Sequence, residues 1–369
     1  VAGCLVGSEM CIRDSQPSLL WYAAAVGYIY PYDPEKSLEL WQRLVELDPL
    51  DDNYHVELSR ALKRVGRDED AKSELLRAIE LNPQNPEPYL ILANRLQAQN
   101  RYDEAHRLYV KSYTLDPDGI IGAWSVAQNY ARLGARAEAM AWLDRVVTLN
   151  PTGRLTFLAA VMVHTELGNW EQADAFAEQF AETYPDDIRV FLVLQEKYIR
   201  NDQPEKALEL YLETYPDLHK PYAVISDEED SWRVIEYAGL LVRVGEAEAA
   251  RPLLQRILER IDEVCRPEGA TRSFLCNWAY LVHAYLHDKD KTLAELRRLI
   301  VDKQQRIYFR EWYRFDRSPY GELDFLKGDP EYDRLMNIVR DDFATQLERV
   351  REMERKGEIP PPPRAETVQ

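Results

Sequence analysis

A proline recurs every 34 residues through the first half of the chain, and this spacing limits the possible fold more than any other feature. The positions are Pro49, Pro83, Pro117, Pro151 and Pro185. Proline ends an α-helix, and the residue before it is pushed out of the helical region. Each proline therefore predicts the end of one helix and a turn to the next, and the constant spacing indicates an internal repeat.

Two further sets of residues share this period. Alanines recur twelve residues before the proline positions, at Ala71, Ala105, Ala139, Ala173 and Ala207. We expect them to be buried where two helices cross, because a larger side chain there would force the helices apart. Five residues before the alanines come Gly66, Gly134 and Gly168, with Asn100 in the matching place. Glycine and asparagine tolerate the left-handed conformation that closes a helix. A single helix pair cannot bury its apolar face alone, so the pairs must stack into a solenoid.

With these positions filled, the chain resembles the tetratricopeptide repeat family. One repeat carries the signature at Tyr89, Leu92, Ala93, Tyr102, Ala105, Tyr109 and Pro117. The resemblance implies an all-α, right-handed superhelical solenoid of about eight helix hairpins with a C-terminal capping helix. It also implies a protein-protein interaction scaffold that binds a peptide or helix on its concave face. The motif residues themselves are structural and do not identify a partner.

The spacing also divides the chain into segments. Hairpins one to six occupy residues 16–216, an inserted loop covers 217–230, and hairpins seven and eight occupy 231–306, with Ala294 as the small residue of the eighth. An aromatic segment and capping helix follow at 307–355, with Asp329 as its N-cap and Pro330 in its first turn. Residues 356–369 are expected to be a disordered, proline-rich tail.

The second, fifth and ninth positions of each first helix face away from the packing stripe and are expected to line the groove. The candidate residues of this peptide-binding groove are Arg60, Leu90, Asn94, Trp124, Gln128, Leu158 and Met162. Chaperone-binding members of the family clamp a carboxylate with lysine and asparagine, but Leu90 stands where that lysine belongs, so this clamp is excluded. Trp124 is the expected peptide anchor. The alternative, that Trp124 packs between neighbouring repeats, stays open.

Charge and motifs exclude several classes of function. The formal net charge of −18 argues against nucleic-acid binding and against docking on anionic lipid by this segment. No P-loop, GxSxG or GxGxxG motif occurs, so we expect neither an enzyme nor a cofactor. His283 and His287 have a spacing that can bind a metal on one helix face, but no third ligand is evident. The acidic stretch at 226–230 is expected to begin a helix.

The first residues do not belong to this pattern. Residues 4–15, CLVGSEMCIRDS, match translated sequencing-adapter DNA, so residues 1–15 are interpreted as an artefact. The natural chain is then expected to start further upstream. Excluding Cys4 and Cys11 leaves Cys265 and Cys276, which we expect to be free thiols in a reducing compartment. The expected location is the cytoplasm, or the periplasm if the missing N-terminus holds a membrane anchor.

The C-terminal end adds a second resemblance. The segments GDPEYDRLMN and ATQLERVRE are similar to the end of a group of bacterial multidomain regulators that combine a TolB-like region with a tetratricopeptide array. In that group a winged-helix, cyclase or kinase domain lies upstream. The alternative function is therefore the sensory or regulatory C-terminal part of a truncated transcriptional regulator or signalling enzyme.

Overall fold

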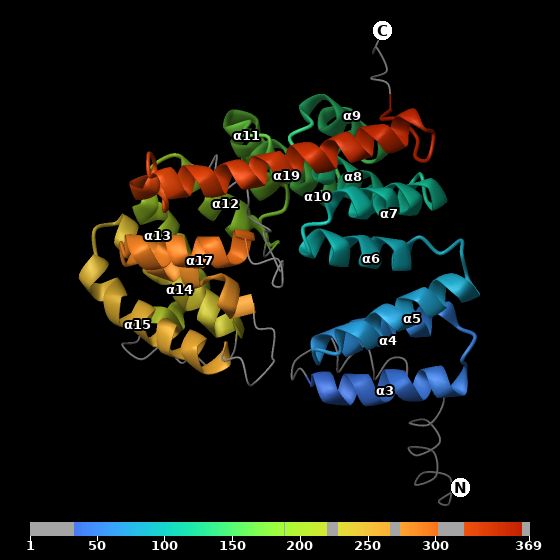
Figure 1. Ribbon diagram of the computed structural model, residues 1–369, viewed down its shortest axis with the longest axis horizontal. Helices are drawn as coiled ribbons and strands as arrows, with labels where there is room; N and C mark the ends of the chain where they lie inside the picture. Colours follow the sequence, from blue (N-terminus) through green and yellow to red (C-terminus); the bar gives the residue numbers. More distant parts are fainter. Residues whose placement is uncertain (1–32, 188, 220–227, 266–273, 302–320, 364–369) are drawn as a thin grey trace, which may run out of the picture. The chain divides into compact units, whose positions relative to one another are not determined.

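The computed structural model describes residues 33–187, 189–219, 228–265, 274–301 and 321–363, and in these ranges the chain is built of helices joined by short turns (Figure 1). The predicted all-α solenoid of helix hairpins is confirmed. The first helices of the hairpins are α4 (Asp52–Arg64), α6 (Glu87–Ala98), α8 (Ile120–Arg132), α10 (Arg154–Glu166), α12 (Arg189–Arg200), α14 (Glu228–Arg243) and α16 (Ala279–Tyr285). The second helices are α3 (Pro34–Leu47), α5 (Asp68–Leu81), α7 (Tyr102–Leu115), α9 (Arg136–Leu149), α11 (Trp170–Thr183), α13 (Pro204–Thr214), α15 (Ala247–Val264) and α17 (Lys289–Val301).

The repeated prolines, alanines and glycines have the roles that their spacing predicts. The second helices α3, α5, α7, α9 and α11 each end two residues before one of the five prolines. The five alanines are fully buried. Gly66, Gly134 and Gly168 have φ between +69° and +78°, and Asn100 has φ +58°. Each 34-residue repeat therefore contains both the residue that forms the turn and the alanine at the helix crossing.

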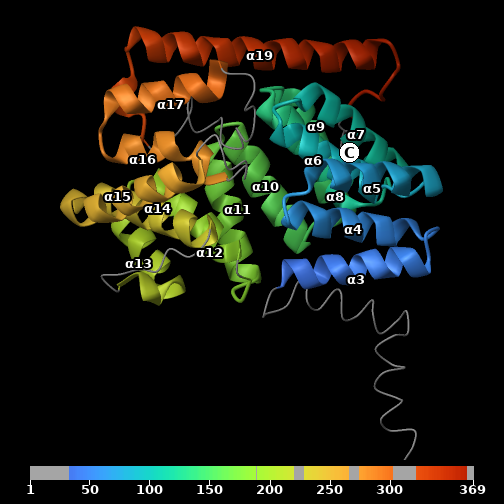
Figure 2. The ribbon, with the colours of Figure 1, turned by 60° about the horizontal axis from the view of Figure 1, so that its bottom comes forward.

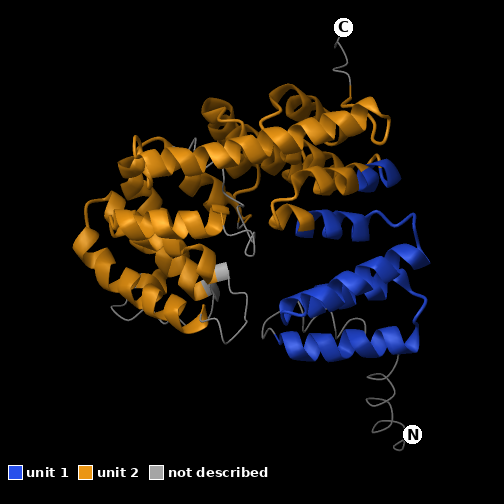
Figure 3. Ribbon diagram, viewed as in Figure 1, with its two compact units in different colours: residues 1–95, 111–116 blue, residues 96–110, 117–369 orange. Residues whose placement is uncertain are grey.

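The chain forms two compact units (Figure 3). Unit 1 comprises residues 1–95 and 111–116, and its core lies between α3, α4 and α5, with Trp41, Leu44 and Leu58 at the centre. Unit 2 comprises residues 96–110 and 117–369. One of its core clusters joins α14, α15, α16 and α17 to the C-terminal helix, with Ile235, Leu254 and Leu296 fully buried.

The eighth repeat follows the spacing in a different register from the one expected. His287 takes the left-handed position with φ +54°, and Thr292, five residues later, is the fully buried residue at the helix crossing. The sequence prediction placed Ala294 there, but Ala294 is exposed. Asp202, with φ +53°, takes the same left-handed position in the sixth repeat. Because histidine and aspartate occupy the left-handed position in these two repeats, the glycine and asparagine spacing alone did not reveal it.

The C-terminal helix α19 (Pro330–Arg355) extends beyond the last repeat. Its N-cap is Asp329, as predicted, whose side chain accepts hydrogen bonds from the backbone N–H groups of Glu331 and Tyr332. The first half packs on α17, where Arg297 bonds Glu331 at 2.8 Å. Within unit 2, the second half runs along α7, α8 and α9 (Figure 2). A helix expected only to cover the last repeat thus also contacts the third and fourth.

The residues directly after α19 close the helix and contact unit 2, while the disorder of the tail stays a prediction. Gly357 has φ +69°, and the N–H of Glu358 bonds the carbonyl of Met353 at 2.9 Å, which closes the helix. Ile359 is buried, and Glu358 pairs with Arg107 at 3.2 Å. Ile359 therefore anchors this segment, whereas residues 356–358, 360 and 361 are exposed. The inserted loop includes a 3₁₀ turn, η1 (Pro216–His219). The calls for residues 1–15, the first helix of hairpin one, residues 220–227, most of the aromatic segment and residues 364–369 lie outside the described residues.

The expectation of two free thiols is wrong. Cys265, directly after α15, and Cys276, in the 3₁₀ turn η2 (Phe274–Asn277), form a disulfide with a Cα–Cα distance of 5.8 Å. The two cysteines are eleven residues apart in a segment where no helix period applies, so the sequence pattern did not reveal the pair. The inference of a reducing compartment, which rested on unpaired cysteines, loses that ground.

Candidate functional site

In unit 1, the expected groove residues lie on α4 and α6. The guanidinium of Arg60 on α4 forms ion pairs with Glu57 and with Glu87 on α6. Leu90 is half-buried, and Asn94 is exposed on the same helix. Arg60 thus helps to hold neighbouring first helices together, and its availability for a partner stays a prediction.

In unit 2, the expected groove residues lie on α8 and α10. Leu158 is only 6% exposed and belongs to a core cluster with Val161 and Phe180. Trp124 packs against this cluster, and its indole Nε1 is buried without a hydrogen-bond partner. The Nε2 atom of Gln128 lies 4.0 Å from the sulfur of Met162. These contacts favour the alternative that Trp124 packs between repeats, whereas its role as a peptide anchor stays a prediction.

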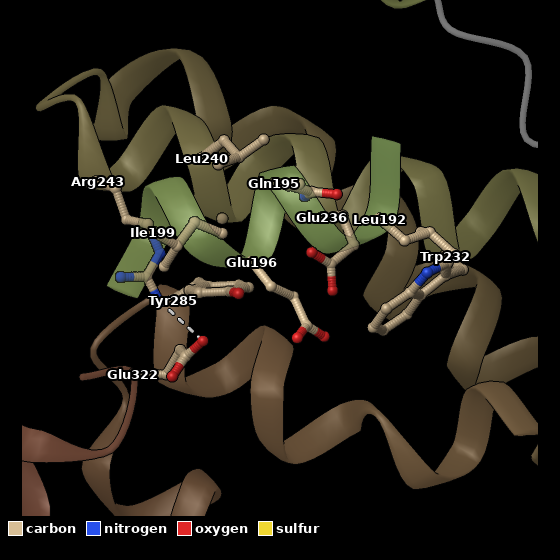
Figure 4. A pocket seen from close by; sticks show the side chains of 11 residues that line it. Leu192, Gln195, Glu196, Ile199, Trp232, Glu236, Leu240, Arg243, Tyr285 and Glu322 are labelled. Atoms are coloured by element: carbon tan, nitrogen blue, oxygen red, sulfur yellow. Dashed lines mark ion pairs between the residues drawn. The ribbon is translucent and has the colours of Figure 1, made fainter. Parts of the chain in front are cut away.

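A pocket of about 200 Å³ opens further along the same unit (Figure 4). Three consecutive first helices, α12, α14 and α16, supply most of its lining. The lining residues are Leu192, Gln195, Glu196, Ile199, Trp232, Glu236, Gly239, Leu240, Arg243, Tyr285 and Glu322. Sequence reasoning did not select any of them.

The repeat spacing nevertheless contained a signal for this pocket. Leu192 and Glu196 lie 34 residues after Leu158 and Met162, at the fifth and ninth positions of the sixth repeat. Trp232 and Gly239 take the second and ninth positions of the seventh repeat, once the loop's nine extra residues are counted. Extending the groove positions past the fifth repeat would have found these four residues.

Aromatic side chains form the walls of the pocket. The Trp232 ring lies against Trp278, with 4.4 Å between ring centroids, so the indole is held in place. Gly239 lies where the Tyr285 ring meets α14, and a Cβ atom there would stand 2.5 Å from the Tyr285 hydroxyl. The absence of a side chain at Gly239 therefore allows Tyr285 to line the pocket.

Acidic side chains outnumber basic ones in the lining. Glu196, Glu236 and Glu322 face one guanidinium, that of Arg243, which pairs with Glu322 at 2.8 Å. Burial, and next the charge of Glu236, raise the pKa of the nearby Tyr211 hydroxyl. The described lining of the pocket thus combines a majority of acidic over basic side chains with two aromatic rings.

The histidine pair does not share a helix face. Helix α16 ends at Tyr285, so His287 lies in the turn beyond it, where its ring packs against Phe325 with 5.4 Å between centroids. Burial, and then the charge of Lys291, lower the pKa of His283. Within the described ranges, no three His, Cys, Asp or Glu side chains gather as a metal site. The acidic stretch begins α14 at Glu228. None of the helices in these ranges is long and apolar enough to cross a membrane.

Comparison with known proteins agrees with this architecture. The tetratricopeptide repeat family model matches residues 53–85, which comprise α4, α5 and the turn that follows. The chain is similar to anaphase-promoting complex subunit 3 of Schizosaccharomyces pombe (strain 972 / ATCC 24843), with 23% identity over 186 residues. That match covers 50% of this chain and 28% of the relative, so the chain spans less than two thirds of the relative's length.

Two solved structures share the fold. The APC/C hetero-tetramer Cut9-Hcn1 is 16% identical, with a TM-score of 0.51, and the match covers 88% of this chain and 56% of that chain. The human IFIT1 dimer with PPP-AAAA is 16% identical, with a TM-score of 0.52, and the match covers 91% of this chain and 73% of that chain. Tetratricopeptide repeats form scaffolds for protein-protein interaction. Residues 53–85 thus match the tetratricopeptide repeat, the same helix pair recurs along the described part of the chain, and both solved structures share this solenoid fold.

Proposed function

We propose that the chain is a non-catalytic scaffold that binds an extended segment of a protein partner on the face presented by its first helices. The observation that carries this proposal is the pocket between α12, α14 and α16, because three consecutive first helices build it. Ligand sites in helical arrays form where neighbouring repeats present side chains to a common surface.

The exposed apolar surface at the pocket supports the proposal that this face binds the partner. Leu192 on α12 is 54% exposed although its neighbours Phe191 and Val193 are buried. An exposed leucine next to aromatic walls offers the apolar contact that dominates the energy of many interfaces. Glu196 and Glu236 in the lining, like the net charge of −18, disfavour phosphate-rich partners and favour basic or neutral protein segments.

Panning a random peptide library against the full chain tests the proposal. Leu192→Asp places a charge on the proposed face, whereas Leu76→Asp places one on the second helix α5, where Leu76 is 47% exposed. We expect enriched peptides to bind the natural chain and Leu76→Asp equally. Leu192→Asp should bind them at least about tenfold more weakly, as loss of an interface anchor does.

Two results would contradict the proposal. One is that panning enriches no peptide over an unrelated helical protein treated in parallel. The other is that the enriched peptides bind Leu192→Asp as tightly as the natural chain.

A further inference from the structure

We propose that the pocket between α12, α14 and α16 receives the guanidinium group of an arginine in the bound segment, an inference that rests on the proposed function. The pocket is small: its volume of about 200 Å³ lies below the range of cavities that enclose whole drug-sized ligands. It suits one long side chain that projects from a segment lying across the first helices.

Charge complementarity selects a cation. Among the described residues that line the pocket, the carboxylates of Glu196, Glu236 and Glu322 outnumber the single guanidinium of Arg243. Arg200 on α12 bonds Asp174 at 2.6 Å as well as Glu196 at 3.3 Å, so Arg200 and Asp174 together add no net charge beside Glu196. An entering anion would meet Glu196 and Glu236, whereas an entering cation would be stabilised by both.

The aromatic walls add a second attraction for a cation. Figure 4 shows the carboxylates of Glu196 and Glu236 turned toward the space that Trp232 and Tyr285 also line. The face of an indole or phenol ring attracts a cation, and the attraction is stronger where water is excluded. Because Trp278 packs against Trp232, the indole loses little conformational freedom when a ligand binds.

Arginine fits this combination better than lysine. A guanidinium is planar, stacks on an aromatic face and donates parallel hydrogen bonds to a carboxylate. It is also more weakly hydrated than an ammonium group, so entry into a half-enclosed pocket costs less. The carboxylates come from two helices, α12 and α14, which would let one guanidinium bond to both sides.

The experiment uses the peptides enriched by panning the full chain. We expect an arginine at a constant place in their sequences, and replacing it by glutamine should weaken binding to the natural chain at least about tenfold, with lysine intermediate. On the protein, Glu196→Gln combined with Glu236→Gln removes the charge and keeps the shape. This double variant should bind the peptides more weakly by a similar factor. Added salt should weaken the complex of the natural chain more than that of the variant.

A matched pair of substitutions controls for total charge. Glu205→Gln combined with Glu209→Gln removes two charges from α13, where both side chains are exposed, and should leave the affinity unchanged. Circular dichroism and thermal unfolding check that both double variants are folded, and the peptide substitutions test the inference without altering the protein.

The outcomes separate the two proposals. If peptides are enriched but lack a basic residue, or if they bind the Glu196→Gln/Glu236→Gln variant as tightly as the natural chain, the arginine pocket is refuted while the scaffold function stands. If no peptide is enriched at all, both proposals fail.

Discussion

Gln346 and Tyr102 lie 244 positions apart in the chain, and the side-chain oxygen of Gln346 accepts a hydrogen bond from the Tyr102 backbone N–H at 2.6 Å. The same oxygen accepts from the N–H of Asp103 at 3.3 Å, and Gln346 Nε2 donates to the Asn100 carbonyl at 2.8 Å. Tyr102 and Asp103 begin α7, and the first N–H groups of a helix have no acceptor within it. Gln346 of α19 therefore caps a helix of the third repeat.

Replacing this cap should destabilise the protein. Gln346→Ala leaves the buried N–H of Tyr102 without its acceptor, and we expect the free energy of unfolding to fall by about 2–3 kcal/mol. Thr345→Ala, at the exposed neighbouring position, should change it by less than about 0.5 kcal/mol. Urea unfolding followed by circular dichroism measures both. Equal stabilities of the two variants would show that the cap contributes nothing.

The buried alanine positions should reject larger side chains. Ala105 is fully buried where α7 crosses its neighbours, so Ala105→Leu should lower the free energy of unfolding by about 1–3 kcal/mol through overpacking. Ala294→Leu is the control, because Ala294 is exposed and should tolerate the change. Thermal unfolding of the two variants compares the sites. A stable Ala105→Leu protein would contradict the tight crossing, and a strongly destabilised Ala294→Leu protein would contradict the register of the eighth repeat.

Gly239 and Tyr285 should behave as a coupled pair. Gly239→Ala brings a Cβ atom to 2.5 Å from the Tyr285 hydroxyl, so the buried ring must move, at a cost of about 1–3 kcal/mol. In a Tyr285→Leu background the same substitution should cost clearly less, because the clashing ring is gone. A double-mutant cycle on the free energy of unfolding measures this coupling. Additive effects of the two substitutions would argue against the close contact.

His106 should make the protein sensitive to acid. Its ring is fully buried on α7 against Tyr130, and desolvation lowers its pKa from 6.5 to about 3. Below pH 6.5 the unfolded chain binds a proton that the folded chain refuses until about pH 3, so stability falls as the pH drops through this window. The loss contributed by His106 should be about 2–3 kcal/mol between pH 6.5 and pH 4.5.

His106→Phe isolates this contribution. Urea unfolding of both proteins across the pH range gives two curves, and the variant should lose about 2–3 kcal/mol less than the natural chain over the same window. The carboxyl groups present in both proteins titrate alike, so their contribution cancels when one stability curve is subtracted from the other. Parallel curves would mean that His106 titrates alike in the folded and unfolded chain.

The disulfide should stabilise the region around the seventh and eighth repeats. Cys265 and Cys276 are eleven residues apart, and breaking the bond between them lets this segment move freely in the unfolded chain. The gain in conformational entropy should stabilise the unfolded state by about 3 kcal/mol. We expect reductant to lower the unfolding temperature of the natural chain and to leave the Cys265→Ser/Cys276→Ser variant unchanged. Mass spectrometry without reductant should show the two cysteine-containing peptides joined. Separate peptides in the folded protein would refute the link.

The candidate site was only partly open to sequence reasoning. The predicted groove positions lie on the first helices of the hairpins, and first helices also line the pocket. Continuing these positions into the sixth and seventh repeats gives Leu192, Glu196, Trp232 and Gly239. Glu322 could not be found this way, because it belongs to no repeat and reaches the pocket through its pairing with Arg243. A spacing rule describes neighbours that repeat, whereas this contact is made once.

The sequence by itself determined the hairpins, because proline, glycine and small alanines act on the backbone within 34 residues of one another, whatever the rest of the chain does. Only the tertiary structure decided the docking of α19 on the third and fourth repeats and the pairing of Cys265 with Cys276. It also decided that His287 and Thr292 take the special positions of the eighth repeat. These contacts depend on how the helices stack, which no local backbone preference encodes.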